Sequence, residues 1–156
     1  GFAFDLTAKV TTSPGDEGVL WATGNQNSGV SIFVQGGRLC VDYNAFSDHT
    51  IVESELEMPA GDCELGVRLQ RDSRSTGFVE VSIDGAACGR AALPLYMRMV
   101  SSVGSSIGMD HGGAVSDRYE APFAFTGTLH EVVIQLLSRE DVAAREAEAA
   151  SEMSRQ

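Results

Sequence analysis

Residues 105–136 read SSIGMDHGGAVSDRYEAPFAFTGTLHEVVIQL, and this stretch decides the fold. A short apolar segment leads to Asp110 and a glycine turn, and a second turn is predicted around Pro122, where proline presets φ. A long strand is expected over 125–136, with Gly127 as a bulge or a close-packing position. We therefore expect a shaped crossover that sets up the closing strand of a β-sheet.

Short strands separated by turns are predicted along the rest of the chain. Apolar and polar residues alternate with a period of two, which is typical of strands that bury one face. Strands are expected over 2–11, 18–23, 29–35, 38–45, 50–58, 63–70, 78–83, 86–91 and 93–103. Within residues 18–23, the alternation places Val19 and Trp21 on one side of the strand and Leu20 and Ala22 on the other.

Gly36-Gly37 and Asp84-Gly85 are expected to form tight hairpin turns, because the primed turn types need positive φ. Together with these turns, the strands predict an all-β fold, an antiparallel two-sheet β-sandwich over residues 1–137. Residues 138–156 are rich in Ala and Glu, and with Ser138 as N-cap they predict a C-terminal α-helix. This helical extension is expected to pack lightly on the sandwich or to face a partner. The chain lacks an initiator Met and is expected to be a piece of a longer protein.

The composition fits one globular domain and argues against two classes of partner. The chain has 156 residues, 43% of them hydrophobic, which is enough to sustain a core. Its net charge is −11, with 22 acidic against 11 basic residues, which argues against binding a nucleic-acid backbone. It contains no run of about 18 apolar residues that could span a membrane. The acidic balance is compatible with solubility, a cationic partner or Ca²⁺, and it does not indicate a cellular location.

Three cysteines, Cys40, Cys63 and Cys88, lack the CxxC spacing of a structural zinc site. Cys40 and Cys63 lie in strand patterns and are expected to be small buried hydrophobic residues. Whether two of the three form a disulfide is left open by the sequence.

Signatures of catalysis are weak in this chain. The run GSSIG over 104–108 differs from the nucleophile elbow of hydrolases, and no helix pattern follows it. Glu53, Glu55 and Glu57 alternate, so on one strand face they could supply the acid and the nucleophile of a glycosidase. A solvent-facing strand surface explains them equally, and the flanks lack the aromatic residues that a sugar-cleaving cleft needs. We therefore expect no catalytic residue.

Candidate binding residues are aromatic and polar side chains scattered along the strands. Carbohydrate binding needs exposed aromatic rings beside polar groups, although a single Trp in an alternating strand is more often core. The candidates for such a ligand site are Trp21, Tyr43, Asn44 and Tyr119, with Tyr96 as a further aromatic residue.

A calcium site is the second binding hypothesis. Asp110 and Asp117 flank a Gly-rich turn and could supply oxygen ligands to Ca²⁺, which prefers six to eight oxygens. Alternatively, the two side chains shape the turn by bonding to backbone N–H groups.

Five phrases of the sequence occur together in an order typical of one family. They are GVLWATGNQNSGVSIFVQGGRLCVDYN (18–44), MPAGDCELGVRLQRD (58–72), VEVSIDGAACGRA (79–91), IGMDHGGAVSDRY (107–119) and PFAFTGTLHEVVIQL (122–136). The last two meet a closing motif G-x-D-x-G-x-x-V-S-x-x-Tyr…Phe-x-Gly-Thr, through Gly108, Asp110, Gly112, Val115, Ser116, Tyr119, Phe125, Gly127 and Thr128. In these phrases the chain resembles, over roughly residues 2–136, the C-terminal domain of bacterial arylsulfatases of the alkaline-phosphatase-like superfamily.

The resemblance implies a laminin G-like or concanavalin A-like jelly roll whose partner is an N-terminal sulfatase catalytic domain, a sulfuric ester hydrolase. It also implies a role in packing on that domain, in substrate access or in oligomerisation. The family's catalysis does not carry over, because no Cys or Ser here begins the C/S-x-P-x-R signature. We expect a non-catalytic domain without a cofactor, apart from the Ca²⁺ considered above. The alternative is a lectin-like carbohydrate-binding module, and its net charge disfavours anionic glycans.

Overall fold

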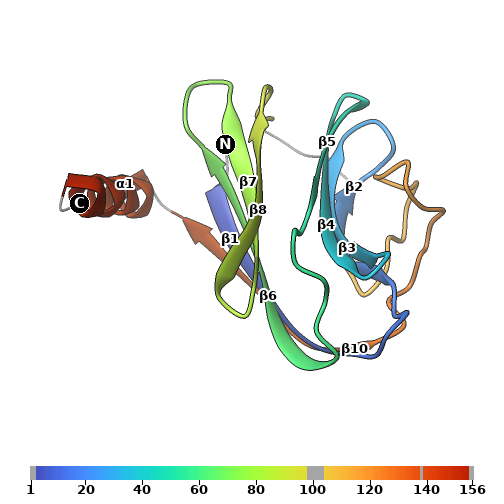
Figure 1. Ribbon diagram of the computed structural model, residues 1–156. Coiled ribbons are helices and arrows are strands. Elements are labelled where there is room, and N and C mark those ends of the chain that lie inside the picture. The colour runs from blue at the N-terminus through green and yellow to red at the C-terminus, as the bar shows by residue number, and fades with distance from the viewer. Residues whose placement is uncertain (1–2, 98–103, 138, 155–156) are drawn as a thin grey trace.

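The computed structural model describes residues 3–97, 104–137 and 139–154 and forms an antiparallel β-sandwich (Figure 1). Sheet A consists of β1 (Ala3–Thr12), β6 (Gly61–Arg71), β7 (Gly77–Ile83), β8 (Ala86–Leu93) and β10 (Thr128–Leu137). Sheet B consists of β2 (Gly18–Gly24), β3 (Gly29–Gln35), β4 (Arg38–Ala45), β5 (Asp48–Glu53) and β9 (Ser106–Ile107). The strand orders are β10-β1-β6-β7-β8 and β5-β4-β3-β2-β9, which confirms the predicted two-sheet, all-β fold.

The core lies between the two sheets and is built from the alternating residues that the sequence indicated. The inward positions of β1, β3, β4, β6 and β7 are almost fully buried, for example Leu6, Ile32 and Val81 at 1%, 0% and 0% exposure. Phe4 of β1 contacts Trp21 of β2 edge-to-face, with ring centroids 5.7 Å apart. β5 also contacts β8, so this pair of edges closes one side of the sandwich.

Strand β2 departs from the predicted alternation. A register shift between Val19 and Trp21 marks a β-bulge against β3. A bulge inserts one residue, so the side chains after it change faces. Leu20 and Trp21 therefore both enter the main core, whereas Val19 and Ala22 lie on the outer side of sheet B. The prediction that Val19 and Trp21 share one side is wrong for this reason.

Two of the three tight hairpin turns were visible in the sequence. Gly36-Gly37 and Asp84-Gly85 have positive φ at both residues, as predicted. The third turn, between β4 and β5, uses Phe46 and Ser47 at φ 54° and 72°, and neither residue type signals such a turn. The Phe46 side chain at its tip is 70% exposed.

The strand expected over 50–58 ends early, at Glu53. Ser54 is buried and exchanges hydrogen bonds with the backbone of β4 through both its N–H group and its hydroxyl group. These bonds hold the chain as it leaves sheet B. Glu55 and Glu57 therefore do not share a strand face with Glu53, and the carboxylate row considered for a glycosidase is not formed.

The strand expected over 93–103 is wrong in the part that the structure describes, because β8 ends at Leu93 and residues 94–97 form no strand. Residues 98–103 lie outside the described residues. The closing strand β10 begins at Thr128 rather than at residue 125. Helix α1 spans Arg139–Ser154, and the proposed cap at Ser138 lies outside the described residues.

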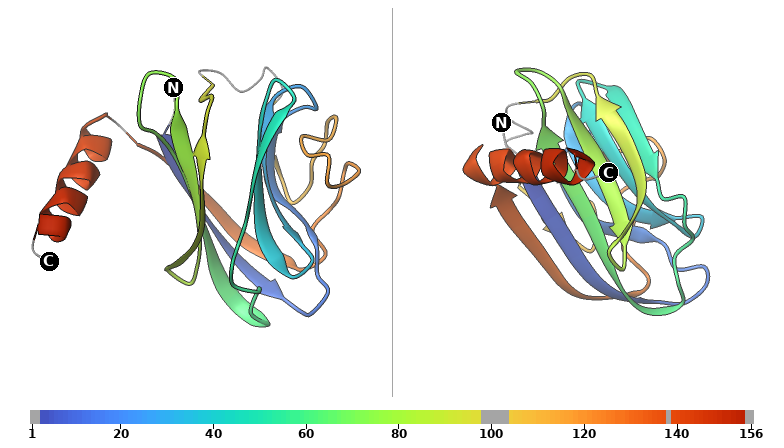
Figure 2. Two further views of the ribbon diagram at one scale, coloured as in Figure 1. Left: turned by 45° about the horizontal axis from the view of Figure 1, so that its top comes forward. Right: turned by 60° about the vertical axis from the view of Figure 1, so that its left-hand side comes forward.

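Helix α1 stands over the outer face of sheet A (Figure 2). Its Arg145 donates a hydrogen bond of 2.7 Å to the Asp5 carboxylate of β1. In the described part of the chain, no helix is both long and apolar enough to cross a membrane.

Candidate functional site

The loop over 108–127 covers the outer face of sheet B, so the stretch that decides the fold acts as a cover (Figure 1). Beneath it, Phe33 is completely buried and Cys40 is 1% exposed. The ring of Phe33 packs edge-to-face against Tyr119 and Phe123, at centroid distances of 5.2 and 6.4 Å. This face of sheet B is therefore a second, smaller core.

Residues 115–119, which we call the clamp, fasten this cover to β4 by polar contacts. Asn44 is buried, and its side-chain amide donates to the carbonyl oxygens of Val115 and Gln26 at 3.0 and 2.9 Å. The Ser116 hydroxyl bonds to the carboxylate of Asp42, which is completely buried.

The clamp reaches β5 and β3 as well. His49 Nε2 lies 3.2 Å from the Asp117 carboxylate, and Arg118 pairs with Glu53. The Tyr119 hydroxyl lies 2.7 Å from the Ser31 hydroxyl. Every residue of the clamp thus contacts sheet B. Residues 115–119, which the sequence marked as distinctive, therefore have a structural role.

Asp42 and His49, two residues of sheet B that the clamp contacts, bond to each other. His49 Nδ1 lies 2.9 Å from both carboxylate oxygens of Asp42. Burial raises the pKa of Asp42, while the hydrogen bonds from Ser116 and His49 oppose this rise. Ser116 bonds to Asp42, Asp42 to His49, and His49 to Asp117, so each nitrogen of the imidazole ring faces a carboxylate. This order lacks the nucleophile–base contact on which hydrolases depend.

The four predicted ligand residues are not gathered on a surface. Trp21, Tyr43 and Asn44 are 6%, 1% and 0% exposed, and Tyr119 is half-buried. The Tyr43 hydroxyl accepts a hydrogen bond of 2.8 Å from the Met97 N–H. Trp21 and Tyr43 thus belong to the main core, whereas Asn44 and Tyr119 bond between sheet B and the cover.

The predicted calcium residues lie in different surroundings. Asp110 is buried, and one of its oxygens accepts from the Val115 N–H at 3.0 Å and the Tyr119 hydroxyl at 2.6 Å. Burial and this carboxylate raise the pKa of Tyr119, so the phenol remains a donor. Asp117 is exposed and pairs with His49. In the part of the chain that the structure describes, no three His, Cys, Asp or Glu side chains are grouped to hold a metal ion. Calcium binding stays a prediction.

All three cysteines are buried free thiols. This placement confirms the expectation for Cys40 and Cys63. Burial, followed by the charge of Glu53, raises the pKa of Cys40 to about 11, so its thiol stays protonated at neutral pH.

The open edge, which we define as Ile107, Ile134 and Leu136, lies opposite the side that β5 and β8 close. β9 and β10 are the terminal strands of their sheets on this side. Ile134 and Leu136 pair with inward-facing residues of β1, and Ile107 pairs with Trp21. All three residues therefore face the interior side of the sandwich, yet Ile107, Ile134 and Leu136 are 60%, 40% and 64% exposed. Among the described residues, these three apolar side chains stay accessible to solvent on this side of the sandwich.

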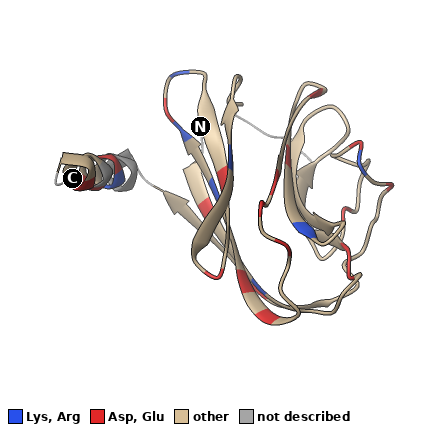
Figure 3. Ribbon diagram, in the orientation of Figure 1, with Lys and Arg blue, Asp and Glu red and all other residues tan. Residues whose placement is uncertain are grey.

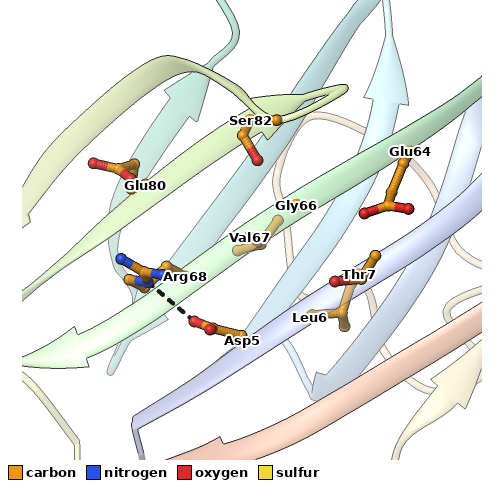
Figure 4. Close-up of a pocket in the computed structure, with 10 residues that line it drawn as sticks. Asp5, Leu6, Thr7, Glu64, Gly66, Val67, Arg68, Glu80 and Ser82 are labelled. Carbon is orange, nitrogen blue, oxygen red and sulfur yellow. Dashed lines mark hydrogen bonds and ion pairs between the residues drawn. The ribbon is translucent and has the colours of Figure 1, made fainter. Parts of the chain in front are cut away.

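A polar trough crosses the outer face of sheet A (Figure 4). Its middle row consists of Thr7, Gly66 and Ser82, which are cross-strand neighbours on β1, β6 and β7. A Cβ atom on Gly66 would come within 2.3 Å of Ser82 Oγ, so glycine leaves the space that this hydroxyl occupies. The trough has a cavity volume of about 180 Å³.

Charged side chains line both sides of the trough. Asp5, Arg68 and Glu80 form the next row of cross-strand neighbours on one side, and Glu64 lies on the other. Burial alone would raise the pKa of Asp5, but hydrogen bonds and charges from Arg145 and Arg68 lower it. Asp5 is therefore ionised at neutral pH.

Sequence reasoning did not single out the open edge or the trough. The apolar run 132–134 was a signal for the edge, because it breaks the alternation of a half-buried strand. The trough had no local signal, since its members come from three strands and are of ordinary polar types. Register alone brings them together.

Comparisons with known proteins support the fold and go no further. No protein-family model matches the sequence, and no curated protein matches it. In structure the chain is similar to domains LG4-5 of the mouse laminin α1 chain, with a TM-score of 0.61. The two are 14% identical, and the match covers 88% of this chain and 37% of that chain. The fold is thus a laminin G-like β-sandwich.

Proposed function

We propose that this laminin G-like sandwich is a non-catalytic accessory domain that packs against another protein domain through its open edge. From the resemblance of the sequence phrases, that domain is the catalytic domain of an arylsulfatase. The accessory domain would stabilise it or border its substrate entrance. The sulfatase nucleophile then belongs to the partner domain, because no Cys or Ser of this chain begins a C/S-x-P-x-R signature.

The observation that carries this proposal is the exposure of inward-facing apolar residues at the open edge. Ile107, Ile134 and Leu136 point to the interior side of the sandwich but remain 40% to 64% exposed. Burial of exposed apolar surface is favourable by about 25 cal/mol per Å², so exposed apolar side chains at a sheet edge favour a protein contact there. β10 is also the terminal strand of its sheet, so its free backbone edge can contribute hydrogen bonds to a partner.

A binding measurement with charged substitutions on β10 tests the proposal. The chain would be mixed with the separately produced catalytic domain, which the proposal expects to carry the C/S-x-P-x-R signature and to be encoded upstream in the same gene. Calorimetry would measure the affinity between the two. We expect a stable complex for the unchanged chain. The double variant Ile134→Asp with Leu136→Asp should lower the affinity at least tenfold, because it places two carboxylates in the apolar contact.

Val133→Asp is the matched control, since Val133 lies on the same strand, is 49% exposed, and points to the outer face of sheet A. It should bind like the unchanged chain. Equal loss in the control and the double variant would exclude the open edge as the contact. An upstream gene region without a sulfatase signature would exclude the arylsulfatase parent. Sedimentation of the chain alone distinguishes a third outcome, since a dimer broken by the double variant would make a second copy the partner.

A further inference from the structure

The trough on sheet A combines three kinds of polar group on a rigid surface. Thr7 and Ser82 supply hydroxyl groups, Arg68 supplies a guanidinium group, and Asp5 and Glu64 supply carboxylates (Figure 4). They stand on three hydrogen-bonded strands, where neighbouring strands are about 4.8 Å apart. Such a surface positions its donors and acceptors without a costly ordering step on binding.

Donors and acceptors alternate across the trough. Arg68 Nε donates to one Asp5 oxygen at 3.1 Å, and Arg145 of helix α1 donates to the other at 2.7 Å. These bonds fix the direction of the Asp5 carboxylate at one rim. Figure 4 shows Glu64 across from it, on the other side of Thr7, and the Ser82 hydroxyl turned toward Gly66.

We propose that this trough binds a neutral carbohydrate through the hydroxyl groups of one or two sugar units. Each sugar hydroxyl both donates and accepts a hydrogen bond, so it matches a surface where carboxylates accept and the hydroxyl and guanidinium groups donate. Hydrogen bonds to ionised groups are the stronger kind, which gives Asp5, Glu64 and Arg68 the main part in recognition.

Most charges of the trough are paired within the protein. Asp5 bonds to Arg68 and Arg145, and Glu80 pairs with Arg90. Such a surface offers little attraction to the charged groups of sulfated sugars and uronic acids, so a neutral sugar fits it better. The Arg90 guanidinium group stacks on the Phe78 ring at 3.9 Å, and the trough is lined by polar residues together with Leu6 and Val67, without an aromatic ring. Recognition therefore depends on hydrogen bonds to hydroxyl groups.

The trough and the open edge are separate surfaces. The trough lies on the outer face of sheet A, whereas Ile134 and Leu136 face the other way on β10. An accessory domain that packs through its open edge therefore leaves the trough free, and either proposal can fail without the other.

An array of neutral, sulfated and amino-sugar oligosaccharides provides the first test, followed by calorimetry with the strongest neutral ligand. We expect binding to neutral oligosaccharides, with no gain in affinity from sulfate groups. Ser82→Ala and Glu64→Gln should each lower the affinity at least tenfold, because each removes hydrogen bonds to the sugar. Asp48→Asn is the control, since it removes the same charge from an exposed carboxylate at the β4–β5 hairpin of sheet B.

Thermal unfolding followed by circular dichroism should give the same midpoint for all three variants, since each change is on the surface. An array without neutral ligands overturns the proposal. So does a neutral ligand whose affinity is unchanged in both trough variants, or lowered equally by Asp48→Asn. A final titration with a hexa-arginine peptide tests whether the trough binds a cationic partner instead. If the peptide binds with a dependence on Glu64 and no oligosaccharide does, the trough serves a cationic partner and the carbohydrate proposal is wrong.

Discussion

The outer faces of the two sheets begin from the same alternation of residues and end in different surroundings. On sheet B, Phe33 and Asp42 point outward from the sandwich and are completely buried, because the loop over 108–127 covers them. On sheet A, Thr7 and Glu80 also point outward and stay partly exposed, with helix α1 held over that face through Arg145. Figure 3 shows charged residues along the strands of sheet A. The difference teaches that a loop distant in sequence decides which face becomes core.

Replacing one outward-facing residue on each sheet should give the largest difference in stability between the two faces. Phe33→Ala should lower the free energy of unfolding by about 3–5 kcal/mol, because it leaves a cavity beneath Tyr119 and Phe123. Thr7→Ala, at a partly exposed position on the outer face of sheet A, should change it by no more than about 0.5 kcal/mol. Urea unfolding at neutral pH measures both. Similar losses in the two variants would show that the loop does not make a core of sheet B's outer face.

A substitution at Gly127 tests how closely the end of the covering loop packs against sheet A. A Cβ atom there would come within 2.6 Å of the Phe125 ring and 2.9 Å of the Thr11 carbonyl oxygen. Gly127→Val should therefore lower the free energy of unfolding by about 1–3 kcal/mol. Gly104→Val is the control, since a Cβ atom at Gly104 meets open space. An unchanged melting temperature for Gly127→Val would count against a close-packing role.

The smallest expected change in stability concerns the contact between helix α1 and the outer face of sheet A. Arg145→Gln removes one of the two guanidinium groups that lower the pKa of Asp5. Because the folded-state pKa of Asp5 lies below the ordinary value of 3.8 for an aspartate, the ion pair contributes stability above that pH. This contribution is lost as the pH falls through the lowered pKa. At pH 7 the variant should lose no more than about 1 kcal/mol, as expected for a partly exposed ion pair.

An NMR titration of the Asp5 carboxyl group checks this directly. Its pKa should rise in Arg145→Gln and stay unchanged in Arg74→Gln, which alters an exposed arginine of the β6–β7 loop. The stability difference between Arg145→Gln and the unchanged chain should shrink toward acid pH. A pKa of Asp5 that does not move would mean that α1 is not held on sheet A through Arg145.

Much of the fold was predictable because strand formation depends on residues two apart. The alternation in β1, β3, β4, β6 and β7 identified their core faces, and the glycines at 36, 37 and 85 identified two hairpin turns. The errors arose where a contact from elsewhere overrode the local pattern. The bulge in β2 put Leu20 and Ala22, which were predicted on one side, on opposite faces. Hydrogen bonds between Ser54 and β4 ended β5.

The candidate sites were much less predictable. Trp21 and Tyr43 have the residue types of a sugar platform, but only the packing of the two sheets decides that their rings are buried. Asp110 has the residue type of a calcium ligand, but one of its oxygens accepts hydrogen bonds from Val115 and Tyr119. Residue type states what a side chain can bind, whereas the surroundings decide what it does bind.

The sequence by itself determined that this chain is an antiparallel sandwich with a C-terminal helix, and that residues 105–136 hold a distinctive crossover. It determined this because periodicity and turn chemistry are local properties of the chain. Only the tertiary structure decided that the crossover is a cover clamped to sheet B, that apolar side chains of β9 and β10 stay exposed, and that Thr7, Gly66 and Ser82 form one trough. Those features depend on strand order and register, which bring together residues far apart in the sequence.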